Sequence, residues 1–119
     1  MLRRKALFIE ITKGGPTADT LDLVRDYAGM GYIVVPVCGP GIDADLAEVV
    51  RLETGAALTR ALLLRDGFAP QRVWEFARSQ QLDLDRSTVI AESNRHDGVF
   101  LTAGVRRIIR PSRAQFAAA

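Results

Sequence analysis

Residues 6–12 read ALFIEIT, and residues 13–16 read KGGP. The first stretch is a short apolar run that contains β-branched residues, and the second is a group of turn residues that interrupts it. This combination predicts a buried strand that leads into a loop. Glu10 and Thr12 are the polar residues of the run, so they are expected near the end of the strand.

The rest of the chain repeats this pattern of a short apolar run followed by a helical segment. The further runs cover residues 32–37, 61–64, 88–91 and 105–109. Apolar residues at helical spacing predict helices that begin after Thr17 or Asp19, after Asp43, at Pro70 and at about Asp97. Strands that lack polar alternation are typically covered on both faces. We therefore predict an α/β fold, a three-layer α/β/α sandwich with a central parallel sheet of about five strands.

Length and composition limit the class of protein. The 119 residues suit one domain, so we expect a single domain over residues 1–119, with a core over about 6–109 and a C-terminal tail over 110–119. A net charge of +2 is too small to indicate a nucleic-acid binder, although arginines gather near both ends. A single cysteine excludes an internal disulfide and a zinc site built from cysteines. No apolar run approaches the roughly 20 residues of a membrane span or the core of a signal peptide, so we expect a cytoplasmic protein without membrane contact.

In a sheet of this kind, ligands bind beyond the carboxyl ends of the strands. Three carboxylates, Glu10, Glu92 and Asp97, follow the first and fourth runs. If they converge, they form an oxygen-rich pocket that suits Mg²⁺. Arg65 or Arg72 could offset the charge of a phosphate, and the turns at residues 14–15 and 39–41 could bind its oxygens through backbone amides. The alternative is that these are ordinary loop carboxylates and turn glycines.

Four stretches resemble the motifs of haloacid dehalogenase-like (HAD-like) phosphatases. Residues 8–14, FIEITKG, stand where that superfamily has D-x-D-G-T, and residues 34–39, VVPVCG, stand where it has a strand ending in Thr or Ser and then Gly. Residues 91–97, AESNRHD, resemble its G-D-x-x-x-x-D motif, and residues 102–105, TAGV, resemble its A-G-V. The resemblance covers about residues 6–109, and it is nearest to the phosphatase domain of phage-type polynucleotide kinase/phosphatases.

The resemblance implies roles for individual residues. Glu10 stands at the position of the attacking aspartate, Thr12 at the general acid/base, Cys38 at the phosphate-binding hydroxyl, and Arg72 at the motif lysine. Phosphate would be bound by Gly14, Cys38, Gly39 and Arg72, and Mg²⁺ by Glu10, Glu92 and Asp97.

Each catalytic position departs from the family pattern. Glu10 is longer than aspartate by one methylene, and Thr12 cannot exchange a proton near neutral pH. Cys38 is a poor hydrogen-bond donor to phosphate. We therefore expect a HAD-like domain with a degenerate active site, catalytically inactive, that acts as a binding or interaction protein. The alternative is a Mg²⁺-dependent phosphohydrolase that acts on exposed phosphates such as polynucleotide 3′-ends.

The partners remain open. An unknown protein, a phosphate-bearing ligand or a second copy of the chain would fit, and the loops are too short for an inserted cap domain. Three other side chains have ordinary explanations: Cys38 as a small buried filler, His96 as a solvated loop residue, and Trp74 as a core residue or interface anchor.

Overall fold

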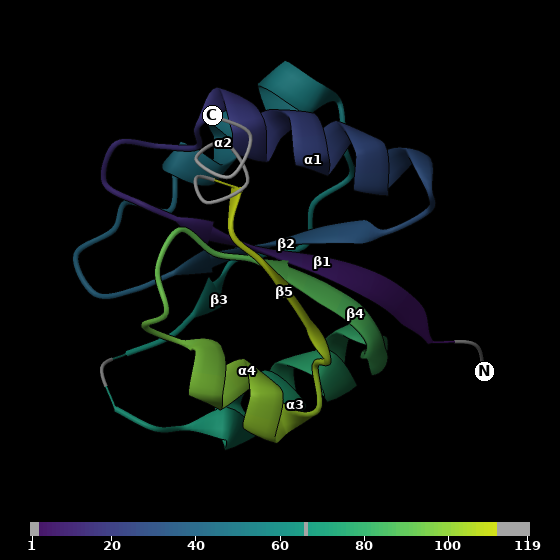
Figure 1. The fold of residues 1–119 in the computed structure, drawn as a ribbon, viewed down its shortest axis with the longest axis vertical. Helices are drawn as coiled ribbons and strands as arrows, with labels where there is room; N and C mark the ends of the chain where they lie inside the picture. Colours follow the sequence, from purple (N-terminus) through teal and green to yellow (C-terminus); the bar gives the residue numbers. More distant parts are fainter. Residues whose placement is uncertain (1–2, 66, 112–119) are drawn as a thin grey trace.

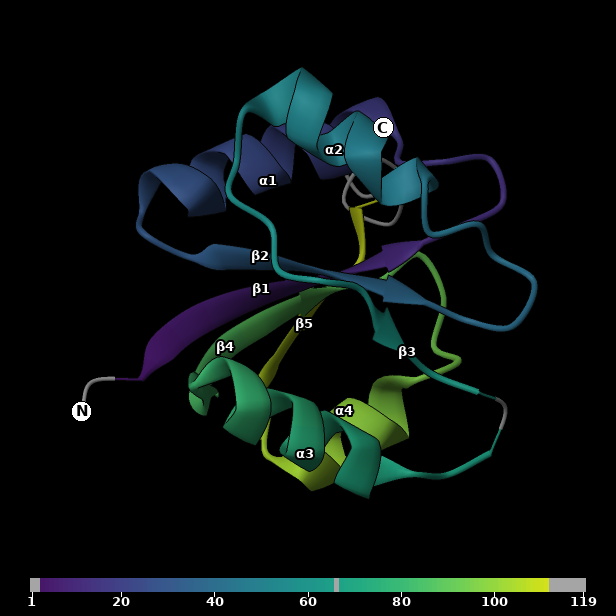
Figure 2. The same ribbon diagram turned by 180° about the vertical axis from the view of Figure 1, so that it is seen from behind.

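The computed structural model describes residues 3–65 and 67–111. Figure 1 shows a central sheet with α1 and α2 on one face and α3 and α4 on the other, and Figure 2 shows the same layers from behind. The strands are β1 (Arg4–Ile11), β2 (Ile33–Cys38), β3 (Leu62–Leu63), β4 (Leu82–Ile90) and β5 (Arg107–Ile109). The helices are α1 (Ala18–Gly29), α2 (Leu46–Thr54), α3 (Pro70–Gln80) and α4 (Asp97–Ala103).

The strand order is β3-β2-β1-β4-β5, and all the pairings are parallel. The predicted three-layer α/β/α sandwich with a five-stranded parallel sheet is therefore confirmed. Glu10 pairs with Val37 of β2, and the neighbouring Ile9 pairs with Ile90 at the end of β4. The ends of β1, β2 and β4 thus lie side by side, where the strand order changes direction and where sheets of this kind bind ligands.

Local sequence signals mark three of the helix ends. Thr17 is the N-cap of α1, and its hydroxyl accepts a hydrogen bond from the Thr20 amide at 3.2 Å. Pro70 occupies the first turn of α3, where its missing N–H costs nothing. Gly55 ends α2 with φ of 69°, a left-handed conformation that glycine adopts without steric cost. The expected cap of α2 at Asp43 was wrong, because the helix begins after Asp45; Asp43 instead accepts a hydrogen bond from the Asp45 amide at 2.9 Å.

The fourth strand is longer than the apolar run at residues 88–91 suggested. β4 begins at Leu82 and includes Asp83, Asp85 and Arg86, which a search for apolar runs passes over. Leu82 is buried, whereas Arg86 is exposed. The first half of β4 is therefore only partly covered, while its second half, Ser87–Ile90, is buried.

The core divides into two clusters, one on each face of the sheet. Alternate residues of β1 contribute to opposite clusters: Phe8 packs on the α3 and α4 side, and Leu7 and Ile9 pack on the α1 and α2 side. Phe8 and Phe100 of α4 meet with ring centroids 5.2 Å apart. Among the described residues, no helix has the length and apolarity to cross a membrane.

Candidate functional site

The alternation of side chains along β1 decides where Glu10 lies. Because Phe8 faces the α3 and α4 layer, Glu10 two residues later lies on the same face. Its side chain is 13% exposed. The Ser93 hydroxyl donates to both carboxylate oxygens at 3.4 Å, and Nδ1 of His96 lies 3.7 Å from Oε2. The carboxylate at the attacking-residue position is thus contacted by two side chains from the loop between β4 and α4.

Thr12 belongs to the loop that joins β1 to α1. Its hydroxyl donates to the Gly15 carbonyl oxygen at 3.2 Å, and the Gly15 amide donates back to the Thr12 carbonyl oxygen at 2.9 Å. Gly15 has φ of 78°, which glycine tolerates because it has no Cβ. The Thr12 side chain therefore closes a turn. Gly14, expected to bind phosphate, lies exposed in this same turn.

Cys38 ends β2 and is buried, which confirms the expectation of a small buried filler. Burial raises the pKa of its thiol, and the nearby Asp43 carboxylate raises it further. A thiol with a raised pKa is a weak nucleophile near neutral pH. Gly39 follows directly, and a Cβ at its position would lie 3.9 Å from Cε1 of His96.

Glu92 is held by the amino end of α1. One of its carboxylate oxygens accepts hydrogen bonds from the Thr20 hydroxyl at 3.2 Å and from the Thr17 hydroxyl at 3.3 Å. A carboxylate in this place is favoured because the amino end of a helix carries partial positive charge. Glu92 is therefore attached to the α1 and α2 layer, whereas Glu10 faces the opposite layer.

Asp97 begins α4 and forms an ion pair with Arg110, in which both side chains are largely buried. The three carboxylates expected to converge thus each have a different set of partners. Within residues 3–65 and 67–111, no group of three or more His, Cys, Asp and Glu side chains is placed to hold a metal ion. This arrangement of the described carboxylates does not fit Mg²⁺, which requires several oxygen ligands around one point.

Arg72 lies in the first turn of α3 and lines a cavity of about 280 Å³ beside His96. We call it the His96 cavity. It lies between the carboxyl end of β3 and the beginnings of α3 and α4, and it is lined by Leu64, Arg65, Gly67, Ala69, Gln71, Arg72, His96 and Val99. Of the four residues predicted to bind phosphate, Arg72 is the one that lines this cavity; Gly14, Cys38 and Gly39 do not.

The structure corrects the expectation for His96. We expected a solvated loop residue, but His96 is only 7% exposed, and it occupies the N-cap position of α4 without a side-chain capping hydrogen bond. Sequence reasoning missed its contact with Glu10, and it also missed Ser93. A signal was available, because both residues follow the fourth apolar run and therefore lie at the same edge of the sheet as Glu10.

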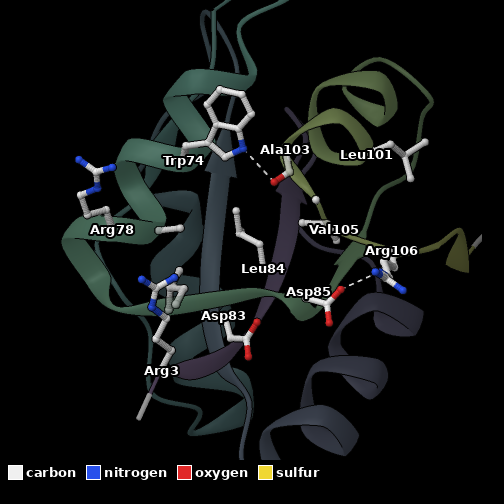
Figure 3. Close-up of a pocket in the computed structure, with 13 residues that line it drawn as sticks. Arg3, Trp74, Arg78, Asp83, Leu84, Asp85, Leu101, Ala103, Val105 and Arg106 are labelled. Carbon is white, nitrogen blue, oxygen red and sulfur yellow. Dashed lines mark hydrogen bonds and ion pairs between the residues drawn. The ribbon is translucent and has the colours of Figure 1, made fainter. Parts of the chain in front are cut away.

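A second concavity lies at the opposite edge of the sheet, beside the amino ends of the strands (Figure 3). We call it the Trp74 groove; its volume is about 780 Å³. The Trp74 indole N–H donates to the Ala103 carbonyl oxygen at 2.9 Å, and Arg106 pairs with Asp85 at 2.6 Å. Trp74 is 48% exposed, so it is not the fully buried core residue that was one of its two expected roles.

No family model matches the sequence, and no curated protein matches it either. Among solved structures, the chain is similar to a crystal structure from Mesorhizobium loti that is provisionally described as a HAD-like phosphatase. The two chains share 16% sequence identity, and the TM-score is 0.65. The match covers 91% of this chain and 72% of the other. At this identity the likeness shows the fold alone, a three-layer α/β/α arrangement that the two chains share.

Proposed function

We propose that this HAD-like domain is catalytically inactive toward phosphate esters and acts as a binding or interaction protein. One observation carries the proposal: both positions that would perform the chemistry have other roles in the structure. Glu10 is contacted by Ser93 and His96, and the Thr12 hydroxyl closes a turn on Gly15.

Covalent phosphoryl transfer needs a carboxylate that approaches phosphorus in line and an acid that protonates the leaving group. Glu10 supplies a carboxylate, but it is mostly enclosed, and its extra methylene moves the oxygens relative to aspartate. Displacements of about 1 Å at a reacting atom can cost roughly a hundredfold in rate. The Thr12 hydroxyl neither gives up nor takes up a proton near neutral pH. We therefore expect both the attack on phosphorus and the protonation of the leaving group to be impaired.

The same reasoning limits the role of a metal. The Asp97 carboxylate is paired with Arg110, and the Glu92 carboxylate is bonded to two threonine hydroxyls of the α1 side. A bound Mg²⁺ would lower the barrier by neutralising charge on the phosphate. These carboxylates do not share a common point with Glu10, so the three do not form a Mg²⁺ site together.

The test is phosphate release with and without Mg²⁺, from a 3′-phosphorylated oligonucleotide and from a small aryl phosphate. Three proteins are compared: the native chain, Glu10→Gln, and Glu75→Gln as a matched control. Glu75 lies exposed on α3, so its replacement leaves the edge of the sheet intact. We expect no turnover above the Glu10→Gln background with any of them.

Mg²⁺-dependent release that disappears in Glu10→Gln and persists in Glu75→Gln would overturn the proposal. It would instead establish the alternative, a phosphohydrolase that uses glutamate at the attacking position and acts on exposed phosphates such as polynucleotide 3′-ends. Release that is equal in all three proteins would indicate a contaminating phosphatase, and the proposal would then be tested again on repurified protein.

A further inference from the structure

The Trp74 groove lies where the sheet is incompletely paired. Within the described part of the chain, β5 pairs with residues 88–90 of β4, at the far end of that strand. The first half of β4 therefore has no strand beside it on the β5 side, and residues 82–85 line the groove there. α3 and α4 supply the other walls, and the volume is about 780 Å³. The fold thus leaves an open surface at which a second protein can reach the sheet and both helices.

The apolar part of this surface has an aromatic side chain in a fixed orientation. Trp74 of α3 is 48% exposed, and Leu101 of α4 is 53% exposed. The hydrogen bond from the indole N–H to the Ala103 carbonyl oxygen, 2.9 Å long, orients the Trp74 ring. A side chain that is already oriented loses little conformational freedom when a partner binds. Tryptophan is also enriched among the residues that contribute most to binding at protein interfaces.

The charges around the groove are of both signs. Asp85 and Arg106 pair with each other. The other three charged residues of the lining form no ion pair with any residue that the structure describes; they are Arg3, Arg78 and Asp83. Figure 3 shows Arg3 and Arg78 on one side of the groove, away from Arg106. A surface with free charges of both signs is complementary to a copy of itself.

We propose that the Trp74 groove is the interface of a two-fold symmetric homodimer. In such an interface, every contact between the two copies is made twice. The free Arg78 guanidinium of each copy faces the free Asp83 carboxylate of the other, and Trp74 and Leu101 of the two copies cover each other at the centre. This inference deepens the proposed function and rests on it, because it names the partner of the interaction protein.

Partners of a single charge sign fit the groove less well. An acidic segment would bring like charges close to Asp83 and Asp85, and a basic segment would do the same at Arg3 and Arg78. Like charges that face each other across an interface select against a partner. A second copy meets each free charge with one of opposite sign. The dimer also leaves the carboxyl edge of the sheet uncovered, because the groove lies at the amino edge.

The experiment is sedimentation equilibrium of the full chain, from about 1 μM to about 1 mM at constant ionic strength. We expect a reversible equilibrium between monomer and dimer. Arg78→Asp and Asp83→Arg should each weaken the dimer by at least about tenfold, because each places two like-charged pairs across the interface. An equimolar mixture of the two variants should dimerise again, because opposite charges then face each other at both positions.

Truncation of the apolar centre gives an independent test. Leu101→Ala should weaken the dimer roughly tenfold, since the two-fold axis repeats the lost contact. The matched control is Leu52→Ala: Leu52 is also an exposed leucine of a helix, but it lies on α2 at the opposite face of the sheet (Figure 1). This variant should dimerise as the native chain does. Circular dichroism checks that each variant folds.

Four results would each overturn the inference. A chain that stays monomeric over the whole range would leave the groove to a different protein. A dimer that neither charge variant weakens, or that Leu52→Ala and Leu101→Ala weaken equally, would use another surface. A mixture of the two charge variants that stays monomeric would exclude the two-fold pairing. Phosphate release in the assay above would overturn the proposed function, whereas a monomeric chain that releases no phosphate would overturn this inference alone.

Discussion

The two edges of the sheet differ in the exposure and the hydrogen bonding of their charged and aromatic side chains. At the amino edge, the Trp74 groove is open, its indole N–H is hydrogen-bonded, and its Asp85–Arg106 ion pair is exposed to water (Figure 3). At the carboxyl edge, the imidazole of His96 is buried and has no hydrogen bond to any residue that the structure describes.

This difference indicates what each edge contributes. The ion pair and the indole N–H at the amino edge have partners or are exposed to water, so they change the stability of the fold little. A buried unpaired imidazole lowers stability, and proteins tolerate such costs mainly where function requires them. The carboxyl edge is therefore the better candidate for a small-molecule site, although its concavity is the smaller of the two.

The largest expected effect comes from removing the unusual group at the carboxyl edge. We expect His96→Leu to raise the free energy of unfolding by about 2 kcal/mol, because leucine fills a similar volume and leaves no nitrogen unpaired. Urea unfolding of the two proteins measures the difference.

His96→Gln is the control for that prediction, because glutamine keeps a polar group in the same place and should give no such gain. A loss of stability in His96→Leu would contradict the comparison. It would mean that the 3.7 Å contact between His96 and Glu10 stabilises the fold as an ion pair.

The amino edge offers a test with a smaller effect of opposite sign. We expect Trp74→Phe to lower the free energy of unfolding by about 1 kcal/mol, because phenylalanine keeps most of the aromatic contact but loses the 2.9 Å hydrogen bond to the Ala103 carbonyl oxygen. Urea unfolding again measures the change. If Trp74→Phe cost nothing, solvent would replace the hydrogen bond fully, and the groove would be even less coupled to the fold than we infer.

The fold could be predicted from the sequence because it rests on local signals. Apolar runs mark the buried halves of the strands, and Thr17, Pro70 and Gly55 mark helix ends through their own backbone preferences. The search for apolar runs failed where a strand is only partly buried. In the first half of β4, acidic residues alternate with leucines, so no apolar run marks it.

The site was less predictable, because its contacts depend on tertiary geometry. The sequence placed Glu10, Glu92 and Asp97 at one edge of the sheet, and they do lie near that edge. It did not reveal that Thr17 and Thr20 hold Glu92, or that Arg110 pairs with Asp97. These partners are separated from the carboxylates by 13 to 75 residues. Strand alternation predicts the face of Glu10, but the partners of Glu92 and Asp97 lie outside the motif, so its spacing does not predict them.

The smallest expected effect is a dependence of stability on pH that arises at the carboxyl edge. Burial raises the pKa of the Cys38 thiol above its ordinary value of 9.0, and Asp43 adds to the effect. As the pH rises, the thiol of the unfolded chain therefore loses its proton first, so the unfolded state is favoured and stability falls. At pH 9.0 half of the unfolded thiols are ionised, so the loss relative to neutral pH is at most about 0.4 kcal/mol.

The variant Cys38→Ala isolates the contribution of this thiol to the pH dependence of stability, because the two proteins share every other titrating group. The difference in their free energies of unfolding, measured in urea at pH 7.0 and 9.0, should shift in favour of the variant at the higher pH, by up to about 0.4 kcal/mol. Asp85→Asn, at the exposed ion pair of the amino edge, should show no comparable shift over the same range. If the Cys38→Ala difference stayed constant with pH, the thiol would ionise equally well in the folded protein. The end of β2 would then be more open to water than its burial indicates, and the contrast between the two edges would be weaker.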